Sequence, residues 1–288
     1  MSGARERESG ARADGEPDEY GVVGHPVAHS WSPFIHAAFA RETRQALVYR
    51  AHDIAAERFS GFVREFAARG GRGLNVTVPH KRAAAELSAE LTARATRAGA
   101  VNTLTFDRGR IRGDNTDGAG LITDLRANLA IRLAGARILL AGAGGAARGV
   151  LGPLLEADPA LLVVANRAPE RARALAGEFG SQGMTVRGCG FDELPPDPFD
   201  LVLNATAASL SGEVPAIPRA AVGPATICYD MAYAKTDTPF VSWSRECGCR
   251  RAVQGWGMLV EQAAESFEIW RGVRPSTAPV LELLAQRA

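Results

Sequence analysis

Apolar residues in the first hundred positions follow two spacings, which predict strands and helices in alternation. Four short apolar runs have the length of strands: residues 20–24, 46–51, 73–78 and 100–106. Three segments carry apolar side chains at helical spacing: residues 33–39, 55–68 and 82–98. An order of this kind favours parallel strands with helices packed over their faces.

The second half of the chain repeats the alternation around more strongly apolar strands. Strands are expected at residues 137–141, 161–165, 199–203 and 226–230. Helices are expected at residues 119–129, from 148 onward, at 239–247 and from 258 onward. The pattern therefore predicts the α/β class, with two α/β domains: an N-terminal domain with a mostly parallel sheet and a second, Rossmann-like domain.

The segment that connects two of these elements is rich in glycine. Residues 142–147 read GAGGAA and follow the strand at 137–141. GxGxxA between a strand and a helix is a dinucleotide-binding fingerprint, because its glycines permit a tight turn and close approach of the backbone to a pyrophosphate. The next strand ends in Asn166 and Arg167 rather than in an acidic residue, and Arg171 follows. An arginine accommodates a 2′-phosphate, so NADP is predicted in preference to NAD.

Residues 73–81 (GLNVTVPHK) alternate polar and apolar side chains before a proline. The predicted faces are Asn75 and Thr77 on one side, and Val76 and Val78 on the other. This alternation predicts a strand with its valines buried and its polar groups directed toward a cleft. The strand ends at Pro79 and brings Lys81 to the start of a helix.

Lysine is rare in this chain. Among 33 Lys+Arg, lysine occurs only at positions 81 and 235. A desolvated lysine can lose its proton, whereas an arginine in a protein cannot. Lys81 is therefore a candidate for a group that transfers a proton, and the alternative is a surface lysine retained by chance.

Two other polar segments allow a structural and a functional interpretation. Ser30 and Ser32 lie directly ahead of a helix that Pro33 opens, so either could be only an N-cap, or both could donate to a ligand carboxylate. Residues 113–118 (GDNTDG) superficially suggest a calcium loop, but the twelfth position is not Glu and a metal is rejected. Asp114 and Asp117 are then turn residues, or one of them is a positioned carboxylate.

Bulk composition excludes some classes of function. The net charge of +1 and the pI of about 7.7 indicate no nucleic-acid partner. No apolar run approaches the roughly 20 residues of a membrane span. The cysteines, at positions 189, 228, 247 and 249, are expected to be reduced thiols of a cytoplasmic protein rather than metal ligands. Residues 1–16 are expected to form a disordered tail.

Together these segments resemble the shikimate dehydrogenase family along nearly all of residues 20–288. The matching motifs are residues 29–33 (HSWSP), 75–81 (NVTVPHK), 100–103 (AVNT), 113–118 (GDNTDG), 142–146 (GAGGA), 166–167 (NR), 230–233 (DMAY) and 257–263 (GMLVEQA). The resemblance implies reversible reduction of 3-dehydroshikimate to shikimate with NADPH, in chorismate and aromatic amino-acid biosynthesis. It implies a substrate domain at 17–117, an NADP-binding domain at 118–255, and C-terminal helices at 256–288 that return to the substrate domain, with the active site in the cleft.

The resemblance also implies the role of individual residues. The catalytic pair would be Lys81 and Asp117. The substrate would be bound by both of these and by Ser30, Ser32, Asn75, Thr77, Asn102, Tyr233 and Gln262. The cofactor NADP(H) would be bound by Gly142, Ala143, Gly144, Gly145, Ala146, Asn166, Arg167, Arg171, Met231, Gly255 and Met258.

Some questions stay open at this level. Ala168 stands where the family often has a threonine, and residues 204–209 (NATAAS) lack a usual glycine, so the degree of preference for NADP is undetermined. A quinate/shikimate dehydrogenase with relaxed cofactor use is the nearest alternative, and a non-catalytic NADP-binding sensor is a more distant one. The sequence leaves the oligomeric state open, and a homodimer is one possibility.

Overall fold

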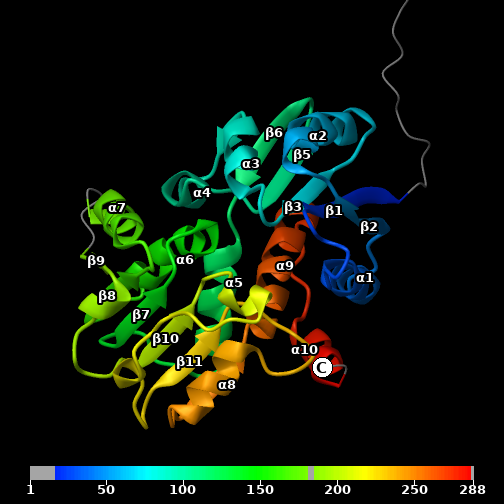
Figure 1. The fold of residues 1–288 in the computed structure, drawn as a ribbon. Helices are drawn as coiled ribbons and strands as arrows, with labels where there is room; N and C mark the ends of the chain where they lie inside the picture. The colour runs from blue at the N-terminus through cyan, green and yellow to red at the C-terminus, as the bar shows by residue number, and fades with distance from the viewer. Residues whose placement is uncertain (1–16, 181–184, 287–288) are drawn as a thin grey trace, which may run out of the picture.

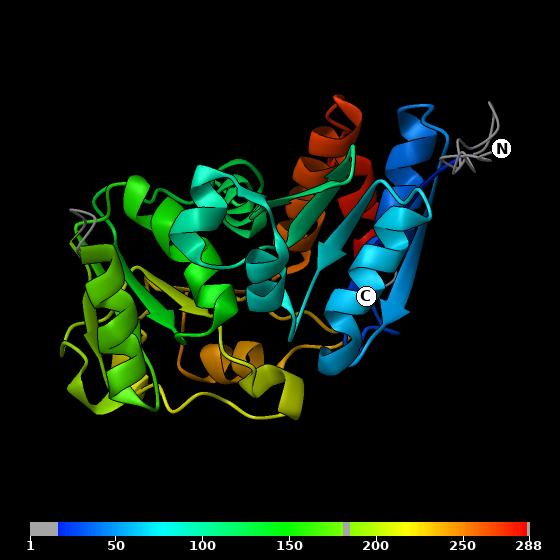
Figure 2. The same ribbon diagram turned by 90° about the horizontal axis from the view of Figure 1, so that it is seen from above.

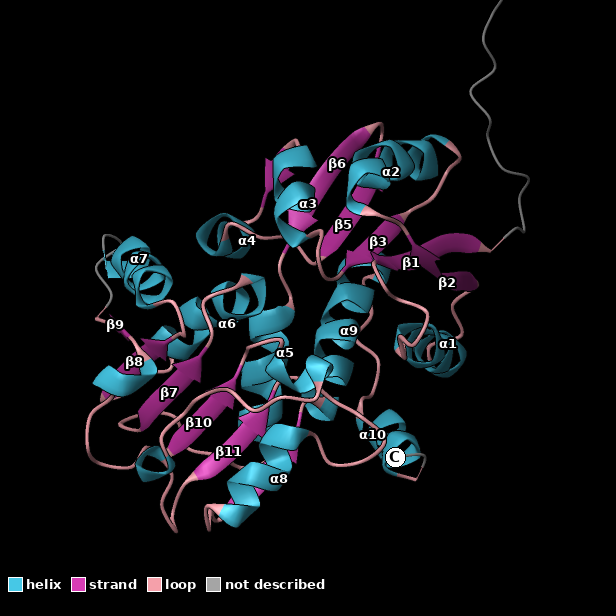
Figure 3. Ribbon diagram, viewed as in Figure 1, coloured by secondary structure: helices cyan, strands magenta, loops and turns pink. Residues whose placement is uncertain are grey.

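The computed structural model describes residues 17–180 and 185–286, which form two α/β lobes (Figure 1). The tail expected at residues 1–16 lies outside the described residues. Each lobe is built on a six-stranded sheet, and helices cover the sheets (Figure 3). The predicted α/β class is thus confirmed.

The N-terminal lobe has the strand order β2-β1-β3-β5-β6-β4. Its strands are β1 Asp18–Gly24, β2 Leu47–Asp53, β3 Gly73–Val76, β4 Glu90–Leu91, β5 Thr103–Asp107 and β6 Arg110–Asp114. Its helices are α1 Ser32–Glu42, α2 Phe59–Ala68, α3 Lys81–Leu87 and α4 Ala93–Ala98. β1 pairs in parallel with β2 and β3, and β4 in parallel with β6, whereas β5 runs antiparallel to β3 and β6. The antiparallel β5–β6 hairpin brings residue 102 and residues 114–117 to the same end of the sheet.

The helix predicted over residues 82–98 is wrong as a single element. Ser88 leaves α3 in an extended conformation, and Ala89 N donates to Ile111 O. The short strand β4 then pairs with β6 before Thr92 caps α4 by accepting a hydrogen bond from Ala95 N. Sheet pairing thus overrides the helix propensity of an alanine-rich segment, and the capping threonine was the available signal.

The predicted alternation at residues 73–81 is correct only in part. All four residues of β3 are buried, because β1 and β5 flank this strand and helices cover the sheet. Val78 lies beyond the strand and is 60% exposed, so its predicted burial is wrong. An interior strand has both faces covered, and period two therefore does not separate a core face from a solvent face here.

The second lobe has an all-parallel sheet with the order β12-β11-β10-β7-β8-β9. Its strands are β7 Arg137–Ala141, β8 Leu161–Ala165, β9 Arg187–Cys189, β10 Leu201–Asn204, β11 Ile227–Asp230 and β12 Arg251–Gln254. Its helices are α6 Gly145–Glu156, α7 Pro169–Gly180 and α8 Pro239–Glu246. Successive strands move outward from β7 in one direction and then from β10 in the other, which is the doubly wound order of dinucleotide-binding domains. β9, β12 and α7 were not among the predicted elements, and α6 begins three residues before the predicted position.

Two long elements lie between the sheets, as Figures 1 and 2 show. α5 spans Asp117–Thr123 and continues into the π-helical turn η2, Asp124–Asn128, while α9 spans Trp256–Arg271 and α10 spans Ala278–Ala285. A Cβ atom at Gly120 would lie 2.6 Å from Gln262 N, so the absence of a side chain at this position allows α5 and α9 to pack closely. At its far end, α9 is tied to the N-terminal lobe by Trp270 Nε1, which donates to Leu104 O at 3.1 Å. None of the described helices combines the length and apolar character needed to cross a bilayer.

Candidate active site

Lys81 and Asp117 form an ion pair at the first residues of two helices, α3 and α5. Lys81 Nζ lies 2.5 Å from Asp117 Oδ2, and the two side chains are 16% and 7% exposed. A surface lysine retained by chance would be solvated and unpaired, so that alternative does not fit. The pair joins α3, which follows β3, to α5, the helix that leads into the second lobe.

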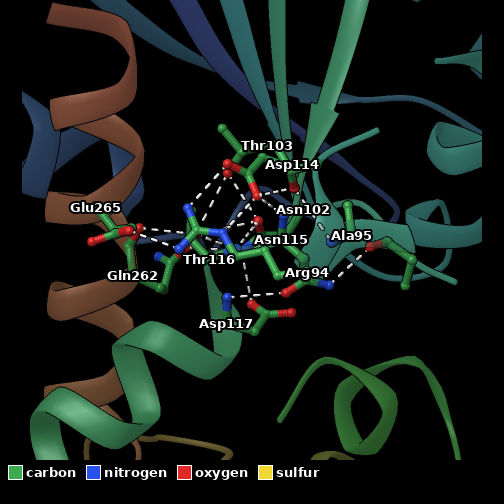
Figure 4. A network of polar contacts seen from close by, with 12 residues as sticks. Arg94, Ala95, Asn102, Thr103, Asp114, Asn115, Thr116, Asp117, Gln262 and Glu265 are labelled. Atoms are coloured by element: carbon green, nitrogen blue, oxygen red, sulfur yellow. Dashed lines mark hydrogen bonds and ion pairs between the residues drawn. The ribbon is translucent and has the colours of Figure 1, made fainter. Parts of the chain in front are cut away.

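Asn102 holds the other oxygen of the Asp117 carboxylate (Figure 4). Its Nδ2 donates to Asp117 Oδ1 and to Thr116 Oγ1, both at 2.9 Å, and lies 3.4 Å from Gln262 Oε1. Its Oδ1 accepts from Thr103 Oγ1 and from the backbone N–H of Thr116. Since one oxygen of Asp117 is engaged by an amide, the other is directed to Lys81.

Asn75 extends this network toward the serine segment. Its Nδ2 lies 3.3 Å from Asn102 O, and its Oδ1 accepts from the Tyr49 hydroxyl at 2.7 Å. Burial raises the pKa of Tyr49 well above its ordinary value, and a smaller opposing effect comes from a hydrogen bond with Ser32. Tyr49 therefore stays a protonated donor, and it connects Asn75 to Ser32.

The two serines are not helix caps in the expected sense. Trp31 occupies the N-cap position of α1 without a side-chain capping bond, and Ser32 is the first helical residue. Ser30 Oγ accepts from the backbone N–H of Ser32 at 3.2 Å. Thr77, the remaining polar residue of the predicted face, lies half-buried beyond β3, and its backbone N–H donates to Val23 O.

Asp114, three residues before Asp117, is a positioned carboxylate as well. Arg94 binds it through Nε at 2.6 Å and Nη2 at 3.0 Å, and Thr92 Oγ1 donates to it at 2.6 Å. Burial is the largest influence on its pKa and raises it, but the hydrogen bonds from Arg94 and Thr92 and the Arg94 charge together lower the pKa below its ordinary value. Arg94 also reaches Glu265 of α9 at 2.7 Å. This pair fixes the segment that carries Asp117.

Gln262 reaches the Asn102 network from α9, whereas Tyr233 lies in the loop after β11 with its ring against Trp256. Gln262 is placed by its contact with Asn102 and by its Nε2, which donates to Leu259 O at 2.8 Å. Burial raises the pKa of Tyr233 to about 12, and its hydroxyl has no hydrogen bond within the part of the chain that the structure describes. A phenol of this kind is a donor that a ligand can use.

The glycine segment forms the turn between β7 and α6. Gly142 has φ +113°, and a Cβ there would lie 3.0 Å from Ala205, so the position requires glycine. A Cβ at Gly144 or Gly145 would meet nothing within 4 Å. The backbone is thus open beside the first turn of α6, where a pyrophosphate binds in such folds. Ala143 and Ala146 complete the segment.

Arg167 and Arg171 lie just beyond the end of β8, and both side chains are exposed. Among the described residues, neither guanidinium has a hydrogen bond or an ion pair, whereas most other arginines near the cleft are paired. Asn166 Nδ2 donates a hydrogen bond to Ala168 O at 3.2 Å, and this bond orients the Asn166 side chain. Two free positive charges at this strand end suit a 2′-phosphate.

A buried carboxylate organises the loops that follow β10 and β11. Asp230 accepts from Asn204 Nδ2 at 3.0 Å and from Ser209 Oγ and Thr238 Oγ1, both at 2.6 Å. Ser209 lies in the loop that lacks the usual glycine, and its hydrogen bond to Asp230 fixes that loop against the end of β11. Next to it, a Cβ at Gly255 would lie 2.5 Å from Met231 O, and Met258 N donates to the Tyr229 hydroxyl. Met231, Gly255 and Met258 therefore gather at one edge of the second sheet.

Several residues of this network were not singled out from the sequence. They are Tyr49, Arg94, Thr103, Asn115 and Thr116. Asn115 and Thr116 lie within the GDNTDG motif and could have been included, since a polar run that becomes buried must find partners. Arg94 gave no signal, because arginine is the ordinary cation of this chain. The four cysteines are free, and within the described ranges no group of three His, Cys, Asp or Glu could hold a metal ion.

Three family models match the chain in sequence order. They describe a shikimate dehydrogenase substrate-binding domain over residues 22–104, a shikimate/quinate 5-dehydrogenase over 124–212 and a shikimate 5′-dehydrogenase C-terminal domain over 255–285. Lys81 lies within the first matched range and the glycine turn at 142–147 within the second, whereas Asp117 and Tyr233 lie between matched ranges.

Full-length relatives agree with these matches. The shikimate dehydrogenase (NADP(+)) of Methylococcus capsulatus is 54% identical over 270 residues, which cover 93% of this chain and 96% of that protein. The Ael1 enzyme from Pseudomonas putida has a TM-score of 0.87 and 44% identity, covering 93% of this chain and 98% of its own. Shikimate 5-dehydrogenase from Thermus thermophilus, solved in complex with NADP(H) and shikimate, has a TM-score of 0.83 and 33% identity, with coverage of 94% and 100%.

Proposed function

The chain belongs to the shikimate dehydrogenase family, and we propose that it catalyses the reversible NADPH-dependent reduction of 3-dehydroshikimate to shikimate in aromatic amino-acid biosynthesis. The observation that carries the proposal is the buried Lys81–Asp117 pair beside a doubly wound sheet with an open glycine turn. Reduction of a ketone needs a proton donor and a dinucleotide site close together, and the two lobes supply one each.

Bound NADPH supplies the hydride. As negative charge develops on the carbonyl oxygen, the Lys81 ammonium donates a proton to it, and in the reverse direction the neutral amine accepts a proton from the hydroxyl. Asp117 orients the amine through Oδ2, and Asn102 keeps this carboxylate oriented through Oδ1. A lysine is suited to the role because it can lose its proton, unlike the arginines that serve elsewhere in the chain.

We assign substrate recognition to hydroxyl and amide groups on three segments. The Ser30 and Ser32 hydroxyls would bind the carboxylate, whereas the substrate hydroxyls and ring would be bound by Asn75, Thr77, Asn102, Tyr233 and Gln262. Support comes from the hydrogen bonds that link Asn75, Asn102 and Gln262 to the Lys81–Asp117 pair, and from the Tyr233 hydroxyl, which has no partner within the described part of the chain. A polyhydroxylated acid needs many polar partners of this kind.

We assign the cofactor to the C-terminal ends of β7, β8, β10 and β11. Gly142, Ala143, Gly144, Gly145 and Ala146 would contact the pyrophosphate, Asn166, Arg167 and Arg171 the adenosine 2′-phosphate, and Met231, Gly255 and Met258 the nicotinamide. Replacing Arg167 with Ala should raise KM for NADP+ by about tenfold and leave KM for NAD+ unchanged. Equal effects on both cofactors would move the 2′-phosphate site elsewhere.

A quinate/shikimate dehydrogenase with relaxed cofactor use is the alternative that one family model also names. Initial rates for shikimate and quinate, each with NADP+ and NAD+, decide between the two. We expect the highest kcat/KM for shikimate with NADP+, and equal values for quinate with NAD+ would favour the alternative. A non-catalytic sensor is disfavoured by the intact Lys81–Asp117 pair, and its signature would be NADP binding without turnover of either acid.

We further propose a cytoplasmic location, since all four cysteines are free thiols, as is typical of reducing compartments. A small-molecule substrate is the expected partner, and neither nucleic acid nor membrane is expected, given the near-neutral charge. A homodimer is an expectation that sedimentation analysis tests.

A further inference from the structure

Three aromatic rings from distant parts of the chain meet at the edge of the candidate substrate site. The Tyr233 and Trp256 ring centroids lie 4.6 Å apart with a 42° angle, and those of Trp31 and Trp256 lie 5.7 Å apart at 81°. Tilted and edge-to-face arrangements at these distances are favourable for aromatic pairs. We call Trp31, Trp256 and Tyr233 the aromatic bridge.

Each member of the aromatic bridge adjoins residues of the proposed site. Trp31 lies between Ser30 and Ser32, in the N-cap position of α1. Tyr233 is itself a proposed substrate contact from the loop after β11. Trp256 is the first residue of α9, the helix that carries Gln262. The bridge therefore connects the serine segment of the N-terminal lobe to the tyrosine loop of the second lobe.

The orientation of Tyr233 depends on this packing. Its hydroxyl has no hydrogen bond with any other described residue, so no polar contact fixes the ring. The Trp256 indole Nε1 is likewise buried without a partner among the described residues. Two hydrogen bonds hold the neighbouring segments together: the backbone bond from Gly255 N to Ala232 O at 3.0 Å, and the bond from Ala234 N to the Gln254 side-chain Oε1 at 2.6 Å. These bonds place the loop, and the ring contact with Trp256 orients the phenol.

We propose that Trp256 is a positioning residue for shikimate, which acts by holding the Tyr233 ring and the serine segment in the arrangement that binds the substrate. The inference rests on the proposed function. It assigns Trp256 an effect on the substrate site and no effect on the pyrophosphate or 2′-phosphate sites, because among the described residues its aromatic contacts are with Tyr233 and Trp31.

The test compares Trp256→Leu with Trp256→Phe. Leucine keeps apolar bulk but has no ring, whereas phenylalanine keeps a ring that can contact Tyr233. We expect W256L to raise KM for shikimate by about tenfold, the effect of losing an aromatic pair, with KM for NADP+ within about twofold and kcat reduced by less than about threefold. W256F should restore most of the lost affinity. Equal effects of leucine and phenylalanine would indicate ordinary packing and overturn the proposal.

A double-mutant cycle with Tyr233→Ala tests whether Trp256 acts through the phenol ring. In the Y233A background, W256L should change KM for shikimate by less than about twofold, because the ring that it positions is gone. Full, independent effects of the two substitutions would contradict the proposal. Trp243→Leu is the matched control, since this tryptophan packs on Phe240 in α8 and should leave both KM values unchanged.

The outcomes separate this inference from the proposed function. If the wild type turns over shikimate and W256L has an unchanged KM for it, the role of Trp256 is overturned and the proposed function stays intact. Absence of shikimate turnover in the wild type would overturn the proposed function, and the role of Trp256 with it. If W256L fails to fold, the pair W256F and Y233A still tests the claim, because W256F should then retain near wild-type KM while Y233A does not.

Discussion

Asp114 at the end of β6 and Asp117 at the start of α5 each pair with a cation, and the two pairs differ in the residue that supplies the positive charge. Lys81 meets Asp117 at 2.5 Å, and Arg94 meets Asp114 at 2.6 Å. Both pairs are largely shielded from solvent, and the two carboxylates are only three residues apart in sequence. One pair uses a cation that can release its proton, and the other uses a cation that cannot.

The difference shows how one short segment serves two purposes. Arg94 binds Asp114 through two nitrogens and extends to Glu265, so it connects α4, β6 and α9. A planar guanidinium is suited to such a bracket because its donors match a carboxylate in geometry. Lys81 makes a single contact with Asp117, and its remaining donors have no partner among the described residues. The arginine pair therefore holds the segment in place, and we assign the acid–base chemistry to the lysine pair.

The largest effect is expected from removal of the proton donor. Lys81→Ala should lower kcat by about 10²–10⁴-fold with little change in KM, because it removes the acid–base group alone. Lys81→Arg keeps the positive charge but not the removable proton, so it should stay similarly slow. Steady-state kinetics with shikimate and NADP+ provide the measurement. Near wild-type turnover in K81R would show that charge, rather than proton transfer, is what the site requires.

The partner of the lysine should have the next largest effect. Asp117→Asn keeps the shape of the side chain but removes the charge that orients the Lys81 amine, so kcat should fall by about 10²-fold. The free energy of unfolding, measured by urea denaturation, should change less in D117N than in Arg94→Ala. A D117N enzyme with unchanged kcat would exclude Asp117 from the mechanism.

Breaking the arginine pair should affect stability more than chemistry. Arg94→Ala leaves the buried Asp114 carboxylate without its main partner, which should lower the free energy of unfolding by about 2 kcal/mol. kcat should fall by less than about tenfold, because Lys81 and Asp117 remain. Arg97→Ala is the matched control on the same helix: it removes the more exposed ion pair with Glu156 and should cost about 0.5 kcal/mol or less. Equal losses of unfolding free energy in R94A and R97A would contradict the structural role of Arg94.

The smallest effect is a pH dependence of that stability loss. In the wild type the pKa of Asp114 is lowered, so its contribution to stability is present above its unfolded pKa and is lost as pH falls through its folded pKa. Without Arg94, burial still raises the pKa of Asp114 while the hydrogen bonds and charge that Arg94 supplies are gone, so this pKa should rise. The gap between wild type and R94A should therefore be largest at neutral pH and shrink as pH falls below about 4.

Denaturant titrations at pH 7, 5 and 3.5 measure this gap. Asp114→Asn is the control, because in that background the substitution of Arg94 should show a much weaker pH dependence. Glu265, whose pKa Arg94 also helps to lower, adds a contribution of the same sign. A gap that widens at low pH would show that Arg94 does not stabilise the ionised carboxylates.

Sequence patterns gave correct predictions where residue type and near neighbours alone decide the local structure. The GxGxxA turn between a strand and a helix predicted the Rossmann-like sheet, because the glycines are required by backbone geometry at that turn. β8 was predicted to the residue, at Leu161–Ala165. The local rules failed where pairing partners decide the outcome, as in residues 82–98, where β4 pairs with β6 and splits the expected helix. The burial of Val78 failed for a related reason, since the strand ends two residues earlier.

By itself, the sequence determined the α/β alternation, the glycine turn and the presence of arginine after β8. It also determined that position 81 carries one of the chain's rare lysines. Each depends on residue type and near neighbours, which are written in the chain. Only the tertiary structure decided that Asp117 meets Lys81, that Arg94 meets Asp114, and that Trp256 lies between Trp31 and Tyr233. Those pairings join residues far apart in sequence, and a contact of that kind exists only once both lobes and α9 have packed together.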